Sequence, residues 1–305
     1  MSKVSSALAI GAAFSAGILI AFQSRINGGL GLALEDGISA ALFSFFSGWL
    51  LIGIVFAFSK KTRTGLSRLF ETVRTGQLPI WFLLGGVLGG FLVMTQGVAA
   101  GTLGIALFTV AVVAGQSISA MTIDTKGLLG ADRRPLIPLR IVGAVLVLIG
   151  VGFVVETPEP TTIGLVFLPL LAGLGLGFQQ AANGRVRIET DSAVAATFLN
   201  FAAGSLFLLI LKLLTIPAAG LPDHWPSQWW LYLGGFVGVG FIAIQVVTVT
   251  KIGVLGLGVL LGTGQLLGSL LIDIFLPVPG QVVSTLHILG VCIALIGALL
   301  VNLKR

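Results

Sequence analysis

The chain has 305 residues, of which 56% are hydrophobic and 9% are charged, and its formal net charge is +6. Soluble domains carry roughly a quarter charged residues, so this composition excludes an ordinary soluble protein. Apolar runs of about twenty residues, long enough to cross a ~30 Å hydrocarbon layer as helices, recur along the whole sequence. They lack the alternation of a membrane β-barrel, so the chain is predicted to be an all-α integral membrane protein.

The apolar runs predict ten transmembrane helices, five in each half of the chain. The first half contributes Val4–Asn27, Gly37–Phe58, Leu78–Val98, Leu103–Asp124 and Leu136–Val155. The second half contributes Thr162–Gly184, Ser192–Thr215, Gln228–Thr248, Ile252–Ile274 and Val282–Leu303. The proline-bearing segment ETPEPTT separates the halves and predicts a solvated turn. Residues 1–157 and 158–305 are therefore expected to be two repeats of one integrated transmembrane domain.

Basic residues predict the orientation, because Lys and Arg accumulate in the cytoplasmic segments of multi-pass proteins. With the N-terminus in the cytoplasm, all 17 Lys and Arg residues except Arg25 and Lys212 fall on the cytoplasmic side. Both termini are then expected in the cytoplasm, and the protein in the plasma (inner) membrane. Because topology explains the positive charge, the charge does not indicate a nucleic-acid partner.

A set of residues recurs at matching positions in the two halves. In the first two spans, Phe22, Gln23, Asn27, Gly28, Glu35 and Gly48 match Phe178, Gln179, Asn183, Gly184, Asp191 and Gly204. In the next three, Trp81, Gly85, Gly86, Gly89, Gln96, Gly104, Gly115, Gln116, Asp124, Gly143 and Gly150 match Trp230, Gly234, Gly235, Gly238, Gln245, Gly253, Gly264, Gln265, Asp273, Gly290 and Gly297. Each half has an odd number of spans, so the second repeat is predicted to be inverted in the membrane. Inverted repeats are typical of secondary transporters.

Amide and hydroxyl side chains form a duplicated polar stripe. Gln23, Ser24 and Asn27 lie on one face of the first span. The sixth span repeats this stripe with Gln179, Gln180 and Asn183. Such amides either join neighbouring helices by hydrogen bonds or line a substrate path. The candidate substrate-binding residues are both stripes together with Gln96, Gln116, Gln245 and Gln265.

Three charged residues near span ends are candidates for gating or proton coupling. Asp124 and Asp273 lie at opposite ends of the predicted path, as gates, proton acceptors or solvated interfacial carboxylates. Arg25 lies about 200° around the helix from Gln23, so it either reaches the headgroups or contacts substrate. A first helix that continues through Leu34 would favour a functional role for Arg25.

The sequence gives no indication of an enzyme. Two histidines and the lone Cys292 lack the spacing of a metal site, and no catalytic set is visible, so no metal and no cofactor is predicted. The glycine clusters LGGVLGG and LGGFVGVG follow no predicted strand. They predict close helix packing in lipid rather than phosphate binding.

Several of these motifs resemble a known family. They are FQSRINGGLGLALEDGISAALFSFFSG, WFLLGGVLGG, VAGQSISAMTID and RIVGAVLVLIGVG, with second copies FQQAANG, WWLYLGG, LGTGQLLGSLLID and HILGVCIALIGALL. Over nearly its whole length, the chain resembles the YdcZ-like branch of the drug/metabolite transporter (DMT) superfamily, as two five-span units fused. The resemblance implies a ten-helix bundle of inverted repeats around a central cavity, which moves small organic solutes by alternating access. Small multidrug resistance relatives carry a glutamate where this chain has Gln23 or Ser24, which argues against proton-coupled export of cationic drugs.

The expected function is secondary transport of a small polar or amphipathic organic metabolite across the plasma membrane by alternating access, with import or export left open. A non-transporting membrane scaffold or assembly factor and a lipid-headgroup flippase are the alternatives. A polar cavity at mid-membrane would favour transport, whereas a solidly packed core would favour the scaffold. The expected partners are a small-molecule substrate and membrane lipids, and the sequence specifies no oligomeric state.

Overall fold

The computed structural model describes residues 3–130, 137–154, 160–277 and 283–301, and the regular structure in this part of the chain is helical. Eight of its apolar helical segments are long enough to cross a membrane. Two shorter apolar helices, α7 and α11, correspond to the predicted fifth and tenth spans. The predicted repeat boundary at residues 157 and 158 lies outside the described residues.

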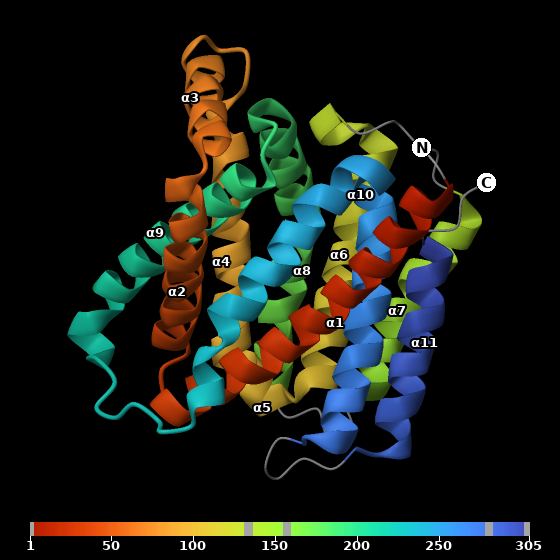
Figure 1. Cartoon of the computed structure of the whole chain (residues 1–305). Coiled ribbons are helices and arrows are strands. Elements are labelled where there is room, and N and C mark those ends of the chain that lie inside the picture. Colours follow the sequence, from red (N-terminus) through yellow and green to blue (C-terminus); the bar gives the residue numbers. More distant parts are fainter. Residues whose placement is uncertain (1–2, 131–136, 155–159, 278–282, 302–305) are drawn as a thin grey trace.

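The helices pack into a single bundle (Figure 1). Those of the first half are α1 (Lys3–Leu34), α2 (Gly37–Phe58), α3 (Lys60–Arg74), α4 (Gly85–Thr95), α5 (Gly101–Leu103), α6 (Ile105–Lys126) and α7 (Pro138–Val154). Those of the second half are α8 (Pro160–Thr190), α9 (Ala193–Ala219), α10 (Gly234–Phe275) and α11 (Thr285–Val301). Short helical turns are η1 (Ile80–Leu84), η2 (Gln96–Ala100), η3 (Leu128–Gly130) and η4 (Trp229–Tyr232).

The first and sixth spans are longer than predicted. Helix α1 continues past Asn27 to Leu34, and α8 continues past Gly184 to Thr190. Hydropathy falls at the polar stripes, but the backbone stays helical because peptide groups in lipid must keep their internal hydrogen bonds. Arg25 therefore lies about 14 Å from the end of α1, which is the deeper position that favours a functional role.

The third span is built from several pieces. The turns η1 and η2 and the helices α4 and α5 join into one apolar segment, Ile80–Leu103. Its η2 part, which begins at Gln96, is a π-helical turn, a feature common at functional sites. The segment ends at Gly104, whose φ of 81° favours glycine, and α6 begins at the next residue.

Helix α10 contains the predicted eighth and ninth spans. It runs for 42 residues, and its two apolar parts are Gly234–Ile252 and Leu257–Phe275. A straight helix of that length would measure about 63 Å, twice the thickness of the hydrocarbon layer. Figure 1 shows α10 changing direction at the end of the bundle where α1 begins, so its two parts run in opposite directions.

The two corners that follow the long first helix of each half have the same backbone. Glu35 between α1 and α2 has a φ of 51°, and Asp191 between α8 and α9 has a φ of 46°. The next residue, Asp36 or Ser192, caps the following helix by accepting a hydrogen bond from the N–H three residues later. The match of Glu35 with Asp191 thus extends from the sequence to the local structure.

Helix α3 was not predicted. It is amphipathic, with five basic residues in KKTRTGLSRLFETVR, and it lies at the same end of the bundle as the start of α1 and the end of α11 (Figure 1). Thr62 makes a 3.0 Å hydroxyl contact with Ser192. A methyl group on Gly65 would overlap the carbonyl of Thr190. Helix α3 therefore packs against the corner between α8 and α9.

The most extensive helix interfaces join one half of the chain to the other: α1 with α10, α7 with α11, α6 with α8, and α2 with α9. Close contacts repeat reciprocally across these interfaces. A methyl group on Gly17 of α1 would overlap the Leu261 carbonyl of α10, and one on Gly173 of α8 would overlap the Val112 carbonyl of α6. Both members of the first contact lie at positions that match those of the second.

A second reciprocal contact lies where α2 meets α9. The rings of Phe45 and Phe201, which occupy matching positions, are 4.9 Å apart between centroids. Gly48 leaves room for Phe201, and its match Gly204 leaves room for Phe45. This aromatic pair is part of a buried apolar cluster that both halves contribute to.

Candidate functional site

All ten predicted substrate-binding residues are buried. They are Gln23, Ser24, Asn27, Gln96, Gln116, Gln179, Gln180, Asn183, Gln245 and Gln265, none more than 4% exposed. The structure distributes them over α1, η2, α6, α8 and both parts of α10. Their burial means that this conformer is occluded around the amides.

One group of amides joins the first and third spans. Asn27 donates from Nδ2 to Oε1 of Gln96 at 2.7 Å, and Gln96 donates from Nε2 to the Ser24 hydroxyl at 3.0 Å. The π-helical turn at Gln96 places its side chain beside α1. Oδ1 of Asn27 has no hydrogen-bond partner among the described residues.

A second group joins the sixth and seventh spans. Gln179 and Asn183 both donate to Oδ1 of Asn200, each at 3.0 Å. The sequence analysis did not identify Asn200. It lies four residues before Gly204, as Ser44 lies four before Gly48, so the repeat offers a pair of matching polar positions as a signal.

Each polar stripe faces the glycine cluster of the opposite half. Gln23 of α1 donates to the Gly234 carbonyl at 2.9 Å, and its amide would lie 2.5 Å from a methyl group on Gly238. In the same way, a methyl group on Gly89 of α4 would overlap the amide of Gln179 in α8. Gly89 and Gly238 are a matched pair, so the repeat of the sequence is also a reciprocal contact in space.

A third group of amides has unused hydrogen-bonding capacity. Both polar atoms of Gln116, Nε2 of Gln180 and of Gln265, and Oε1 of Gln245 have no partner in the part of the chain that the structure describes. Gln116 and Gln180 both lie beside Gly258 of α10. A buried amide atom left without a hydrogen bond costs about 1–3 kcal/mol.

The carboxylate of Asp273 binds the start of another helix. Its two oxygens accept hydrogen bonds from the backbone N–H groups of Ile105 at 3.2 Å and Ala106 at 2.6 Å, at the N-terminus of α6. A carboxylate there is favoured by the helix dipole. Asp273 is thus a link between the second half and the first. The side chain of its match, Asp124, lies outside the described residues.

Arg25 joins α1 to the end of α10. It donates from Nε to the Leu276 carbonyl at 3.2 Å and from Nη2 to the Pro277 carbonyl at 3.5 Å, and its guanidinium lies over the ring of Trp230. These carbonyls follow the last turn of α10, where a cation is favoured. Arg25 therefore does not join the polar stripe of Gln23.

An ion pair links the corner between α1 and α2 to α9. Lys212 Nζ lies 2.5 Å from Oδ2 of Asp36 and donates to the Gly220 carbonyl at 2.7 Å. Burial by itself would raise the pKa of Asp36, but the hydrogen bonds from Lys212 and Ser39 outweigh it and hold the pKa below its usual value.

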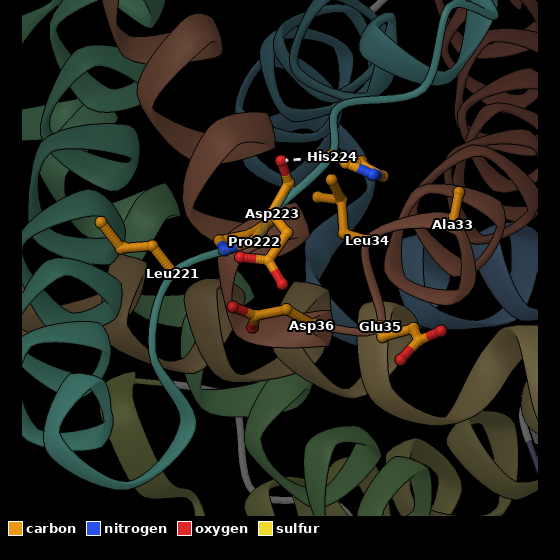
Figure 2. A pocket seen from close by; sticks show the side chains of 8 residues that line it. All are labelled: Ala33, Leu34, Glu35, Asp36, Leu221, Pro222, Asp223 and His224. Atoms are coloured by element: carbon orange, nitrogen blue, oxygen red, sulfur yellow. Dashed lines mark hydrogen bonds between the residues drawn. The ribbon is translucent and has the colours of Figure 1, made fainter.

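Asp36 also borders a small pocket of about 370 Å³, which is lined by residues 33–36 and 221–224. Figure 2 shows the Asp223 carboxylate directed toward Asp36 and the Glu35 carboxylate pointing away from both. His224 lines the pocket beside them, and its Nδ1 contacts the Asp223 carbonyl at 2.8 Å. Among the described residues, neither this pocket nor any other place brings together three His, Cys, Asp or Glu side chains that could hold a metal ion.

Comparisons with known proteins agree with the sequence motifs. The model of the family described as "Putative inner membrane exporter, YdcZ" matches the chain twice, over residues 8–153 and 164–300, which is one match for each half. A search of curated proteins finds no match.

A solved structure titled "Crystal structure of protein" is similar in fold, with a TM-score of 0.56 at 18% sequence identity. The similarity covers 98% of this chain and 96% of that one.

The predicted resemblance to the YdcZ-like branch is confirmed by the family match. The chain is a multi-pass membrane protein that belongs to the YdcZ family of inner-membrane exporters, within the drug/metabolite transporter superfamily.

Proposed function

We propose that this protein exports a small polar or amphipathic organic metabolite by alternating access, and that its two halves are inverted five-span repeats. The family match supports export, and the reciprocal contacts between matched positions support a pseudo-two-fold relation between the halves. The start of α1 and the end of α11 at one end of the bundle agree with cytoplasmic termini (Figure 1).

The observation that carries the proposal is the set of buried amides with unmet hydrogen-bonding capacity on both halves. Gln116 and its match Gln265 each keep amide atoms without a partner within the described structure. In an outward-open or inward-open conformer, these atoms would contact water or substrate, which removes the cost of leaving them unmet. The occluded conformer would then be one stage of the transport cycle.

The glycine faces supply the surfaces on which such a cycle would move. Gly89 and Gly238 let α4 and α10 approach the amides of Gln179 and Gln23, so each stripe can slide along a smooth helix of the other half. On the outer side, Arg25 and Asp273 would hold the halves together until the path opens outward. Opening would exchange these bonds for contacts with water.

The test replaces the unpartnered amides by an apolar residue of similar size. Gln116→Leu combined with Gln265→Leu removes amides that cost stability, so the folded state is expected to be as stable as the wild type or more so. Export is expected to fall by tenfold or more, because the path loses one polar contact in each half. Untargeted mass spectrometry of the growth medium would identify metabolites whose release depends on the wild-type chain.

The matched control is Gln77→Leu combined with Gln228→Leu, which changes one exposed glutamine in each half. It is expected to export at the wild-type rate. Wild-type export by the Gln116 and Gln265 double variant would remove the amides from the path. A large loss of stability in that variant would instead assign them to holding the bundle together, as in a non-transporting scaffold.

A further inference from the structure

One group of buried amides has space beside it. Gly258 lies in α10, which packs on both α6 and α8. A methyl group on Gly258 would lie 3.4 Å from Nε2 of Gln116 in α6 and 3.9 Å from Oε1 of Gln180 in α8. Both are ordinary van der Waals distances, so there is room for a methyl group at this point. Two buried amides from different helices thus border one small space.

Helix packing does not require a glycine at position 258. At Gly264 of the same helix, a methyl group would lie 2.2 Å from the Phe14 carbonyl, so the close approach of α1 does require that glycine. Inside a helix, glycine is less favourable than alanine because it loses more conformational freedom on folding. Gly258 therefore weakens α10 without bringing another helix closer. Its effect is to leave space next to the amides.

The two amides offer hydrogen bonds of both kinds. Both polar atoms of Gln116 and Nε2 of Gln180 have no partner among the described residues. Gln116 thus presents a donor and an acceptor side by side, and Gln180 adds a second donor. A ligand group in which an N–H stands next to a C=O, as in a primary carboxamide or a lactam, pairs with Gln116 through two hydrogen bonds.

The point lies where an exporter takes up its substrate. Gly258 is the second residue of the apolar part Leu257–Phe275, which follows the bend of α10 at the end of the bundle where α1 begins (Figure 1). This end is cytoplasmic in the proposed orientation. Gln116 lies about 10 Å along α6 from Ile123, the last residue of its apolar span, so it is well inside the hydrocarbon layer.

The surrounding charges disfavour an ionic ligand. Among the charged side chains described on α6, α8 and α10, none is both buried and unpaired. Arg185 and Arg187 each pair with an acid four residues further along α8, Lys126 and Lys251 are exposed, and Asp273 binds the N-terminus of α6. An ion brought to Gln116 would lose its hydration without gaining an opposite charge, which is costly inside a membrane.

We propose that the point where Gln116, Gln180 and Gly258 meet binds the polar group of the exported molecule, and that this group is an uncharged carboxamide or lactam. Gln116 pairs with its N–H and C=O, and Gln180 supplies a second donor. Gly258 leaves the space that the group enters when α6 and α10 separate. This inference rests on the proposed export function and narrows its substrate to neutral amides.

The first test compares a neutral amide with an acid of nearly the same shape. The full chain is reconstituted in proteoliposomes, and transport of a compound identified by the export screen is measured with nicotinamide or nicotinate as competitor. Nicotinamide is expected to inhibit at a concentration about tenfold lower, because the carboxylate has no donor and brings an unbalanced charge. The compounds that the screen identifies should themselves be uncharged at neutral pH and carry an amide or lactam.

The second test adds a methyl group to the space. Gly258→Ala is expected to be at least as stable as the wild type, because the methyl group fits and alanine favours the helix. It is expected to raise the half-saturating substrate concentration about threefold or more and to leave the maximal rate nearly unchanged, since it narrows the site without blocking helix motion. Gly240→Ala, with its nearest neighbour at 3.9 Å, is the matched control on α10 and should change neither quantity.

The outcomes separate this inference from the export function itself. Charged compounds in the screen, or nicotinate that competes as well as nicotinamide, would overturn the inference and leave export standing. Failure of both competitors would also overturn it. Gly258→Ala with the wild-type half-saturating concentration, or with clearly lower stability, would remove Gly258 from the site. If the release of no compound depends on the chain, the export function fails, and the inference fails with it.

Discussion

For the ion pair between Lys212 and Asp36, we predict that replacing one member lowers the unfolding free energy more than replacing the other. Lys212→Met leaves a carboxylate that still accepts hydrogen bonds from the backbone N–H of Ser39 at 2.9 Å and its hydroxyl at 2.6 Å. The loss is one charged hydrogen bond, about 1.5–3 kcal/mol of unfolding free energy. Asp36→Asn keeps the helix cap but leaves the buried ammonium with only the Gly220 carbonyl among the partners seen in the described residues. An uncompensated buried charge costs about 3–5 kcal/mol.

The unfolding free energy of each variant can be measured by denaturation in mixed micelles. Asp36→Asn is expected to destabilise the protein more than Lys212→Met, although it changes fewer atoms. The double variant is expected to be more stable than Asp36→Asn alone, because it has no unpaired charge. If Lys212→Met costs as much as Asp36→Asn, or if the double variant is the least stable of the three, the reasoning from burial is wrong.

Two further predictions concern the pH dependence of the Asp36 contacts and the close approach of α10 to Gln23. The depressed pKa of Asp36 means that its contribution to stability is fully present above the ordinary aspartate value of about 3.9 and is lost as the pH falls through the lower folded-state pKa. Acid titration of the unfolding free energy checks this, and Asp36→Asn should remove that part of the pH dependence. Gly238→Ala is expected to destabilise the bundle by about 1–3 kcal/mol, because the new methyl group, 2.5 Å from Nε2 of Gln23, would displace this buried amide from its hydrogen bond with the Gly234 carbonyl. Gly240→Ala, whose methyl group would be 3.9 Å from its nearest neighbour, is the control and should be tolerated in the same assay.

Hydropathy and the repeat predicted the spans well because both are properties of short, continuous stretches. The ends of α1 and α8 were wrong for a physical reason. Polar stripes lower the hydropathy near Asn27 and Gly184. The stripe amides donate hydrogen bonds to side chains of other helical segments, so they can be buried and the helices continue. Such partners cannot be read from one segment alone. The amphipathic pattern of α3 was present in the sequence but was interpreted only as a source of basic charge.

The candidate site was likewise predicted only in part. The sequence indicated which amides are duplicated, and the structure buries all of them. It did not indicate Asn200, because a single asparagine in an apolar span has no local pattern, nor the π-helical turn that directs Gln96 toward Asn27. For Arg25 the sequence leaves headgroup and substrate contact open, because the end of α10, which it contacts, becomes its neighbour only on folding.

Alternating access requires that the buried amides become exposed to each side of the membrane in turn. In a Cys292→Ala background, Gln180→Cys places a thiol at a position that is 1% exposed in this conformer. A membrane-impermeant thiol reagent is then applied to right-side-out and to inside-out vesicles. Thr64→Cys on α3 and Ser227→Cys between α9 and η4 serve as controls for the two sides, and Phe108→Cys serves as a buried apolar control.

Alternating access predicts that Gln180→Cys reacts from both sides. Thr64→Cys should react only in inside-out vesicles, and Ser227→Cys only in right-side-out vesicles. Phe108→Cys should stay unlabelled throughout. A thiol at position 180 that reacts from neither side, or from one side only, in vesicles where the controls behave as expected would contradict alternating access.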